Sequence, residues 1–281
     1  MFISSYCRYL AACVIPLCLL LGFQAAHGAD IAYKIRQGND TSVSLELGLA
    51  LLAADIPVVG WVGEDPEDPT AAEVEVGLLI EGRANWRGLF VETNLNSFSI
   101  FAMGFTPWSN DSTSVDLVFS DGLGEYEPGI GAFESVNYRK SDFVAGIRAT
   151  HHFDKTLLQL EGYSDISGQH DGQMLALQLG RFRQIRNWNL HGLLGARYFS
   201  DSMVDYYFGI TEEESTADIP SYEASGGILA SLEIGVTLPL TEKWLFKSTV
   251  EGLYLPDSIL DSPLVEDKVG FIASTALSYV F

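Results

Sequence analysis

The last residues of the chain, from Phe271 to Phe281, alternate between two kinds of side chain. Apolar, aromatic or β-branched residues occupy every second position, and smaller residues such as Ser274 and Ser278 mostly lie between them. A period of two residues places the two sets on opposite faces of a β-strand. The final residues therefore predict a strand with two unlike faces that stops on an aromatic carboxy-terminus.

This ending resembles the closing strand of bacterial outer-membrane barrels. Tyr279 lies two residues before Phe281, on the same predicted face. In those proteins such an ending is the signal that the barrel assembly machinery reads. We therefore interpret Tyr279 and Phe281 as an assembly signal, and the assembly machinery and the lipid of the outer membrane become expected partners.

The amino-terminus has the features of a secretory signal peptide. Arg8 provides a positive charge, residues 10–23 form an apolar core, and Ala26-His27-Gly28 offers small residues before a cut at Ala29. We expect a signal peptide over 1–28 and one barrel domain over 29–281. All three cysteines precede residue 29, so the exported chain would contain no disulfide and no thiolate site.

The composition narrows the classes of function. The chain of 281 residues has 16 Lys and Arg against 37 Asp and Glu, a formal net charge of −21. Nucleic-acid binding needs a basic face, which this balance opposes. After the signal segment no apolar run reaches the roughly 20 residues that a helical membrane span needs. The apolar residues instead occur in short alternating pieces, the pattern of a transmembrane barrel.

The alternating pieces predict about twelve strands in an all-β, antiparallel, up-and-down transmembrane barrel. Their predicted ranges are 43–54, 74–84, 87–96, 98–106, 113–121, 142–153, 156–165, 172–183, 188–198, 224–238, 242–254 and 269–281. Merging the two pieces at Ser97 and losing one more strand would give ten.

The predicted connections fall into two classes when they are counted back from Phe281. Those at 85–86, 107–112, 154–155, 184–187 and 239–241 are short, and those at 55–73, 122–141, 199–223 and 255–268 are mostly long. Short periplasmic turns and longer extracellular loops are typical of outer-membrane barrels. A soluble sandwich or lipocalin-like barrel, with the apolar face inside, is the alternative that periodicity alone leaves open.

The pleat of each predicted strand assigns one face to lipid and one to the lumen. Tryptophans at 61, 86, 108, 188 and 244 fall near predicted strand ends, where aromatic girdles occur. Charged and histidine side chains on the inward faces have two interpretations: they pair to fill a polar lumen, or they line a narrow selective pore. The inward set is Glu46, Glu75, Glu81, Arg83, Glu92, Arg148, His152, Glu161, His191, Arg197, Glu233, Lys247 and Glu251.

Catalysis would need a histidine within reach of a carboxylate or hydroxyl. His170-Asp171 lies in a Gly-flanked turn, Gly168 to Gly172, which needs no catalytic explanation. We expect no catalytic residue, no cofactor and no histidine metal site, and retain a hydrolase built on His152 or His191 as a third hypothesis. The acidic stretches 64–68, 212–214 and 257–267 fall in outer loops and are expected to be solvated, or to meet lipopolysaccharide through calcium or magnesium.

Three stretches in the second half of the chain resemble the MipA/OmpV family of outer-membrane proteins. The first is Asp205-Tyr206-Tyr207-Phe208-Gly209 with the later Ile219-Pro220-Ser221-Tyr222, the second is the turn from Gly168 to Gly172, and the third is Asp261-Ser262-Pro263-Leu264-Val265. The resemblance covers roughly residues 140–281. It implies that the aromatic loop residues Tyr206, Tyr207, Phe208, Gly209 and Tyr222, with Ser262 and Pro263, fold an outer loop over the barrel mouth or, as a second interpretation, bind a partner.

The resemblance implies a barrel in the cell outer membrane that acts as an envelope scaffold for murein-hydrolysing and murein-synthesising enzymes. A narrow channel for small solutes is the alternative, and charge reversal at Arg148, Arg197 or Lys247 would then alter conductance. Murein lies on the periplasmic side, whereas the family motifs fall in outer loops. The scaffold surface is therefore expected at the short turns together with residues 29–42, unless the predicted orientation is reversed.

Overall fold

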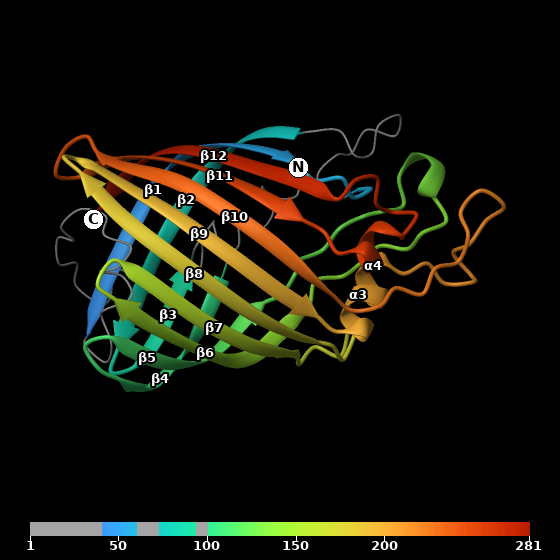
Figure 1. Ribbon diagram of the computed structural model, residues 1–281, viewed down its shortest axis with the longest axis horizontal. Helices are drawn as coiled ribbons and strands as arrows, with labels where there is room; N and C mark the ends of the chain where they lie inside the picture. Colours follow the sequence, from blue (N-terminus) through green and yellow to red (C-terminus); the bar gives the residue numbers. More distant parts are fainter. Residues whose placement is uncertain (1–40, 61–72, 94–100) are drawn as a thin grey trace.

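Twelve antiparallel strands close into one barrel in the computed structural model, which describes residues 41–60, 73–93 and 101–281 (Figure 1). Each strand pairs with its neighbours in chain order, and β1 pairs with β12. The strands are β1 Ser42–Asp55, β2 Glu73–Trp86, β3 Leu89–Thr93, β4 Phe101–Ser109, β5 Thr113–Asp121, β6 Phe143–Phe153, β7 Thr156–Asp165, β8 Gln173–Ile185, β9 Trp188–Phe199, β10 Gly227–Pro239, β11 Trp244–Tyr254 and β12 Val269–Val280. The prediction of an up-and-down barrel is confirmed, and the ten-strand alternative is wrong. The predicted signal peptide lies outside the described residues.

The strands β3 and β4 differ most from their predicted ranges. They are two strands paired antiparallel, with Leu89 opposite Phe105, so the merger at Ser97 is wrong. The turn before β3 is at Arg87-Gly88, not at 85–86, and both of its residues have positive φ. β4 continues past 106 to Ser109, with a register shift between Phe105 and Trp108. The predicted strand ended at 106, before Pro107. A proline is tolerated at such an irregularity because no backbone amide has to donate a hydrogen bond to the neighbouring strand there.

Closure of the barrel joins the two ends of the described chain. Leu49 of β1 lies opposite Leu277 of β12, and the amide of Phe281 donates to the carbonyl of Leu45 at 3.1 Å. Every strand therefore has a partner strand on both sides in the part of the chain that the structure describes.

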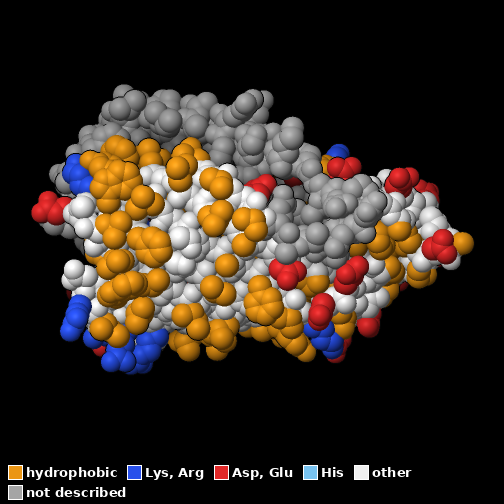
Figure 2. Space-filling view, turned by 90° about the horizontal axis from the view of Figure 1, so that it is seen from above, with side chains coloured by type: hydrophobic (Ala, Val, Ile, Leu, Met, Phe, Trp, Pro, Cys, Tyr) orange, Lys and Arg blue, Asp and Glu red, His pale blue; other side chains and the backbone are white. Residues whose placement is uncertain are grey.

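The outer wall of the barrel is apolar, as the outward faces assigned from the sequence require. Figure 2 shows hydrophobic side chains spread along the wall, with most of the visible acidic side chains at one end and most of the basic ones at the other. Four tryptophans, at 86, 108, 188 and 244, are between 42% and 50% exposed near the short-turn end, and Phe143, Tyr198, Tyr254 and Phe271 are exposed near the other. The soluble alternative, with its apolar face inside, is therefore wrong. Trp61 lies outside the described residues.

The two ends of the barrel differ as the sequence predicts. Short turns join strands at the end where Phe281 lies, and long connections gather at the opposite, long-loop end (Figure 1). Two helices that the sequence did not predict, α3 (Asp201–Phe208) and α4 (Asp257–Leu260), lie at the long-loop end, and a 3-10 turn η1 spans Gly131–Phe133. Among the described residues no helix has the length and apolarity to cross a membrane.

The long connections pack into a compact layer, which we call the loop cap. Its main core includes Val58, Tyr126, Met203, Tyr207 and Ile259, all at most 5% exposed. A second buried cluster adds Val59, Val136, Ile210, Ile219 and Leu264. The long loops therefore have a hydrophobic core of their own, which continues onto the strand ends through Met174 and Phe199.

Candidate functional site: the charged lumen and the loop cap

A belt of alternating charge runs around part of the lumen at one level. The strand register places Asp116, Arg148, Glu161 and Arg197 side by side across β5 to β9, with Ala176 of β8 between the last two. Arg148 donates to Glu92 at 2.5 Å and to Asp116 at 3.1 Å. Burying these charges is tolerable because each positive group meets a carboxylate.

A second arginine completes this cluster from β2. Arg83 donates to Glu92 at 2.7 Å and stacks over the ring of Phe90, with its guanidinium carbon 4.1 Å from the ring centre. Arg148 approaches the same ring at 5.4 Å. Asp116 also accepts from Thr106 at 2.7 Å. Arg83 and Arg148 are therefore held by carboxylates on one side and by the ring of Phe90 on the other.

A lysine holds two carboxylates where β11, β1 and β2 face the lumen. Glu46 of β1 and Glu81 of β2 are direct cross-strand partners. The ammonium of Lys247 on β11 contacts both, at 2.6 Å for Glu81, and Ser278 donates to Glu46 at 3.3 Å. Two like charges directly opposite each other are destabilising, so Lys247 is needed to hold this pair.

The third polar group of the lumen contains a histidine. His191 of β9 and Glu233 of β10 are both buried, with 2.8 Å between Nε2 and Oε1. Arg197 on the same strand as His191 interacts electrostatically with Glu161 and Glu251. The inward faces predicted for these residues agree with the structure.

The two histidines of the hydrolase hypothesis are not brought together. His152 and His191 point into the lumen from β6 and β9, which are three strands apart. Within the part of the chain that the structure describes, the hydrogen bond of His191 is with a carboxylate, and no serine or threonine hydroxyl contacts it. No group of three metal-ligating side chains is found in those residues either. The acidic stretch 64–68 lies outside them.

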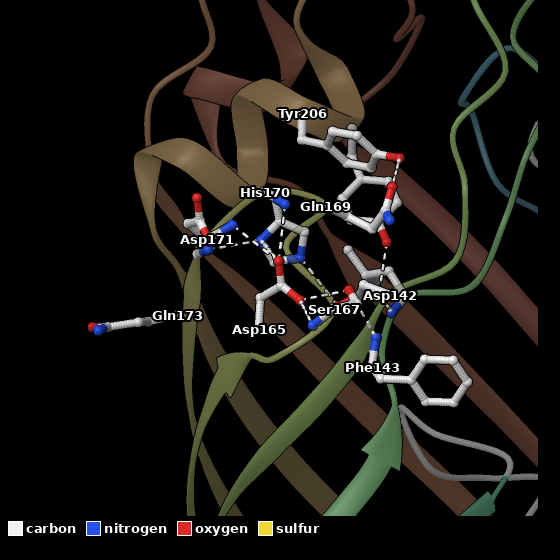
Figure 3. A network of polar contacts seen from close by, with 12 residues as sticks. Asp142, Phe143, Asp165, Ser167, Gln169, His170, Asp171, Gln173 and Tyr206 are labelled. Atoms are coloured by element: carbon white, nitrogen blue, oxygen red, sulfur yellow. Dashed lines mark hydrogen bonds and ion pairs between the residues drawn. The ribbon is translucent and has the colours of Figure 1, made fainter.

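The loop cap contains a buried polar chain that joins three connections. The hydroxyl of Tyr207 on α3 donates to Asp142 Oδ1 at 2.6 Å, and Asp142 Oδ2 lies 3.1 Å from Nε2 of His170 (Figure 3). Burial works against the charged form of Asp142, but the hydrogen bonds from His170 and Tyr207 outweigh it and lower the pKa of the carboxyl. Burial and this carboxylate raise the pKa of Tyr207 well above its ordinary value, so its hydroxyl keeps a proton to donate.

Both ring nitrogens of His170 form hydrogen bonds. Nδ1 accepts the amide of Gly172 at 2.8 Å, so the ring proton is assigned to Nε2, which donates to Asp142. A side chain at Gly172 would meet Nδ1 at 2.6 Å, which explains the glycine. The carboxylate of Asp165 accepts hydrogen bonds from the backbone amides of Ser167, His170 and Asp171, each within 2.9 Å (Figure 3). His170 therefore has a structural role as a brace in the turn and has no nitrogen left for catalysis.

A buried ion pair in the loop cap corrects one expectation. Glu214 belongs to the acidic run 212–214, which was expected to be solvated, but only Glu212 and Glu213 are exposed. Arg139 meets Glu214 at 2.7 Å and donates to the carbonyl of Gly209 at 2.9 Å. Burial opposes the charge of Glu214, but bonds from Arg139 and from the amides of 211 and 137 lower its pKa to about 2.

The family-motif residues lie together in the loop cap. Tyr207 is fully buried and Phe208 is 6% exposed, whereas Tyr206 is half-buried and accepts the amide of Lys140 at 2.9 Å. Gly209 follows α3 as its cap and donates to the Asp205 carbonyl. The remaining motif residues come from two other segments: Tyr222 donates to the carbonyl of Ser258 at 2.9 Å, Ser262 donates to that of Phe208 at 2.6 Å, and Pro263 follows it, half-buried.

Sequence reasoning missed four polar residues of the cap: Tyr126, Arg139, Asp142 and Glu214. The hydroxyl of Tyr126 donates to the carbonyl of Tyr207, and Tyr126 pairs with Arg139 through a two-way backbone bridge. Their signal was weak because these contacts join distant parts of the chain: Tyr207 lies 65 residues from Asp142 and 81 from Tyr126, and Glu214 lies 75 from Arg139.

Comparison with known proteins gives the family. The family described as "MltA-interacting protein MipA" matches residues 66–281. The putative outer membrane protein YiaT of Escherichia coli K12 is 25% identical over 183 residues, which cover 64% of this chain and 74% of that one. The MltA-interacting protein of the same organism is 23% identical over 146 residues, covering 51% of this chain and 58% of that one.

Solved structures with similar barrels are more distant. OmpT, an outer membrane protein of Vibrio cholerae, covers 86% of this chain and 100% of its own, with 5% identity and a TM-score of 0.39. The toluene transporter TodX of Pseudomonas putida covers 92% and 95%, with 12% identity and a TM-score of 0.34. The family match extends over most of the barrel, and the named relatives are outer-membrane proteins. The chain is therefore an outer-membrane β-barrel that belongs to the MipA family.

Proposed function

We propose that this barrel is a plugged envelope scaffold whose partners are murein-hydrolysing and murein-synthesising enzymes. The observation that carries the proposal is that the inward charges bond to one another while the long loops form a packed cap. A conducting pore tunes selectivity with charges that face its water and ions. Here Arg148 and Lys247 are each bonded to two carboxylates, which leaves little charge to act on a passing ion.

The name of one relative supports the choice of partner. A member that is 23% identical is named for its interaction with MltA. Short turns face the periplasm in barrels of this class, so the loop cap would face outward. The murein enzymes would then meet the short-turn end.

Exposed basic residues lie in most of these short turns, and acidic residues are exposed at 111, 154 and 242 in the same set of turns. Arg87, Arg186 and Lys243 are exposed there, and the first two have φ of 52° and 54°. Glycine, asparagine and aspartate adopt positive φ more easily than arginine. Arginine at both positions therefore favours a role for the charge over the local conformational preference.

Two measurements test the proposal. Refolded residues 29–281, checked as a folded barrel by heat-modifiable gel migration, should stay silent in planar bilayers in which a porin conducts. Stable open steps would overturn the scaffold in favour of the narrow channel.

The second measurement is binding of a purified lytic transglycosylase to the barrel in detergent. Removing the three charges (R87A, R186A and K243A together) should weaken binding at least tenfold. A control that changes exposed charge on the loop cap, E212Q with E213Q, should bind as the unaltered protein does. Equal binding by all three proteins, or loss only in the cap variant, would refute the periplasmic-tip surface.

A further inference from the structure

Two arginines interrupt the apolar outer face of β8. The outward row of this strand reads Leu175, Leu177, Leu179, Arg181 and Arg183, and all five are exposed. A charged side chain on the lipid face costs about 2–4 kcal/mol at the middle of the bilayer and about 0–1 kcal/mol near its interfaces. The change from leucine to arginine therefore places Arg181 and Arg183 at the interface on the short-turn side.

The surroundings of these arginines leave them open to a ligand. The neighbours of Arg181 on the flanking strands are Gly192, which has no side chain, and Thr156. Lys155 is exposed in the adjacent turn, and its carbonyl accepts the amide of Phe182 at 2.9 Å. Within the described residues, neither arginine nor Lys155 forms an ion pair. Two guanidinium groups thus share one outward patch, and neither forms an ion pair with a carboxylate of the described residues.

The same face carries an apolar hollow further along the wall. Its volume is about 460 Å³, and its lining includes Ile147, Leu160, Gly162, Leu175, Leu177 and Tyr198. It is open because small residues such as Gly162 lie among larger ones. Leu179, between Leu177 and Arg181, continues the apolar row from the hollow to the arginines.

The spacing of the two features fits one lipid molecule. Arg181 lies four positions after Leu177, about 13 Å along the strand and about 10 Å along the membrane normal at the usual strand tilt. One leaflet of the hydrocarbon core is about 15 Å thick. A lipid whose headgroup binds the two arginines can therefore place an acyl chain in the hollow. Guanidinium groups bind phosphate through paired hydrogen bonds, which favours a lipid with net negative charge over a zwitterionic one.

We propose that Arg181 and Arg183, with the hollow between β6 and β10, form a binding site for one anionic phospholipid of the periplasmic leaflet. The site points sideways into the membrane, whereas the turn tips of the scaffold surface point along the barrel axis. It does not depend on which enzymes the scaffold holds.

Native mass spectrometry of the detergent-solubilised mature barrel tests this site. With phosphatidylglycerol and phosphatidylethanolamine of the same acyl chains, we expect one retained phosphatidylglycerol and at least fivefold less phosphatidylethanolamine. R181Q with R183Q should lower phosphatidylglycerol retention at least fivefold. The matched control R87Q with K243Q removes the same charge from turn tips and should retain the lipid. Equal loss in both variants, or equal retention of both lipids, would overturn the site.

Two further measurements separate the headgroup from the acyl chain. G162L fills the hollow and should lower retention severalfold while keeping the preference for phosphatidylglycerol; unchanged retention would refute the acyl-chain part. Glycerol 3-phosphate has the charge of the headgroup without the acyl chains, so it should not displace the lipid at millimolar concentration. Effective displacement would refute a role for the acyl chain. R181K with R183K keeps the charge but loses the paired hydrogen bonds, so it should retain an intermediate amount of phosphatidylglycerol. Normal heat-modifiable migration would show that this variant is folded. Retention as low as that of R181Q with R183Q would then contradict a site based on charge.

Discussion

The hydroxyl of Tyr207 donates a 2.6 Å hydrogen bond to Asp142, a residue 65 positions earlier in the chain. Asp142 immediately precedes β6, and Tyr207 lies on α3 in the connection between β9 and β10. Both groups are fully buried. This bond joins the loop cap to the rim of the barrel, so the cap is fixed to the wall at this point and not only by its hydrophobic core.

Loss of this hydroxyl should loosen the cap. Y207F leaves Asp142 buried with one donor fewer, which costs roughly 1–3 kcal/mol for an unsatisfied buried group. Hydrogen exchange of segments 122–142 and 201–222 should speed up while the strands stay protected. Y206F is the matched control, because Tyr206 is half-buried and its bond to Lys140 is exposed. A faster exchange in Y206F than in Y207F would contradict the assignment.

Acid should open the cap through Glu214. The folded pKa of this carboxyl is about 2, below its ordinary 4.5, so its charge stabilises the cap fully above pH 4.5 and progressively less as the pH falls toward 2. The lowered pKa of Asp142 acts in the same direction. We expect exchange in segment 209–222, corrected for its intrinsic pH dependence, to rise between pH 5 and pH 3. E214Q should be faster at pH 6 and much less sensitive to pH.

The partner of Glu214 provides the control for that prediction. R139M removes the guanidinium and leaves a buried carboxylate, which costs about 3–5 kcal/mol for a broken buried pair. Its cap should be open at pH 6 and should gain protection as the carboxylate takes up a proton. An R139M cap as protected as the unaltered one would show that the pair does not stabilise the cap.

The barrel could be predicted from the sequence because it depends on a short-range pattern. Alternation fixes the face of each residue, as for Glu233 and Ile234, and the two-residue turns fix which strands pair. The errors occurred where local signals compete. The strand predicted to end at 106 continues to Ser109, and the turn at Arg87-Gly88 has arginine where asparagine or aspartate is usual.

The polar contacts could not be predicted in the same way. Which carboxylate Arg148 would meet depends on side-chain reach across three strands, from β6 to Glu92 on β3. The burial of Glu214 depends on Arg139, 75 residues away in another loop. A run of three acidic residues gives no local sign that only the last of them is buried.

The lysine in the lumen should be essential only while its two carboxylates are charged. K247M leaves Glu46 and Glu81 opposite each other without the ammonium that contacts both, and we expect a loss of about 3–5 kcal/mol for a broken buried pair. The denaturant midpoint for loss of heat-modifiable migration measures it. K247M combined with E81Q should recover most of the loss, because the repulsion is removed. Equal midpoints for the single and double variants would refute the coupling.

The carboxy-terminal aromatics should matter for assembly more than for stability. Tyr279 packs edge-on against Trp244, with ring centres 5.4 Å apart, and against Phe281 at 5.0 Å, on the exposed outer wall. Such pairs contribute about 0.5–1.5 kcal/mol each, too little to unfold a closed barrel. Y279A with F281A should therefore refold in detergent nearly as well as the unaltered chain but yield much less heat-modifiable barrel in the outer membrane of a Gram-negative cell. Y254A removes an exposed ring at the opposite end and should assemble normally. If Y254A lost as much assembled barrel as Y279A with F281A, or if the latter refolded equally poorly in detergent, the ending would contribute packing and would not be a signal.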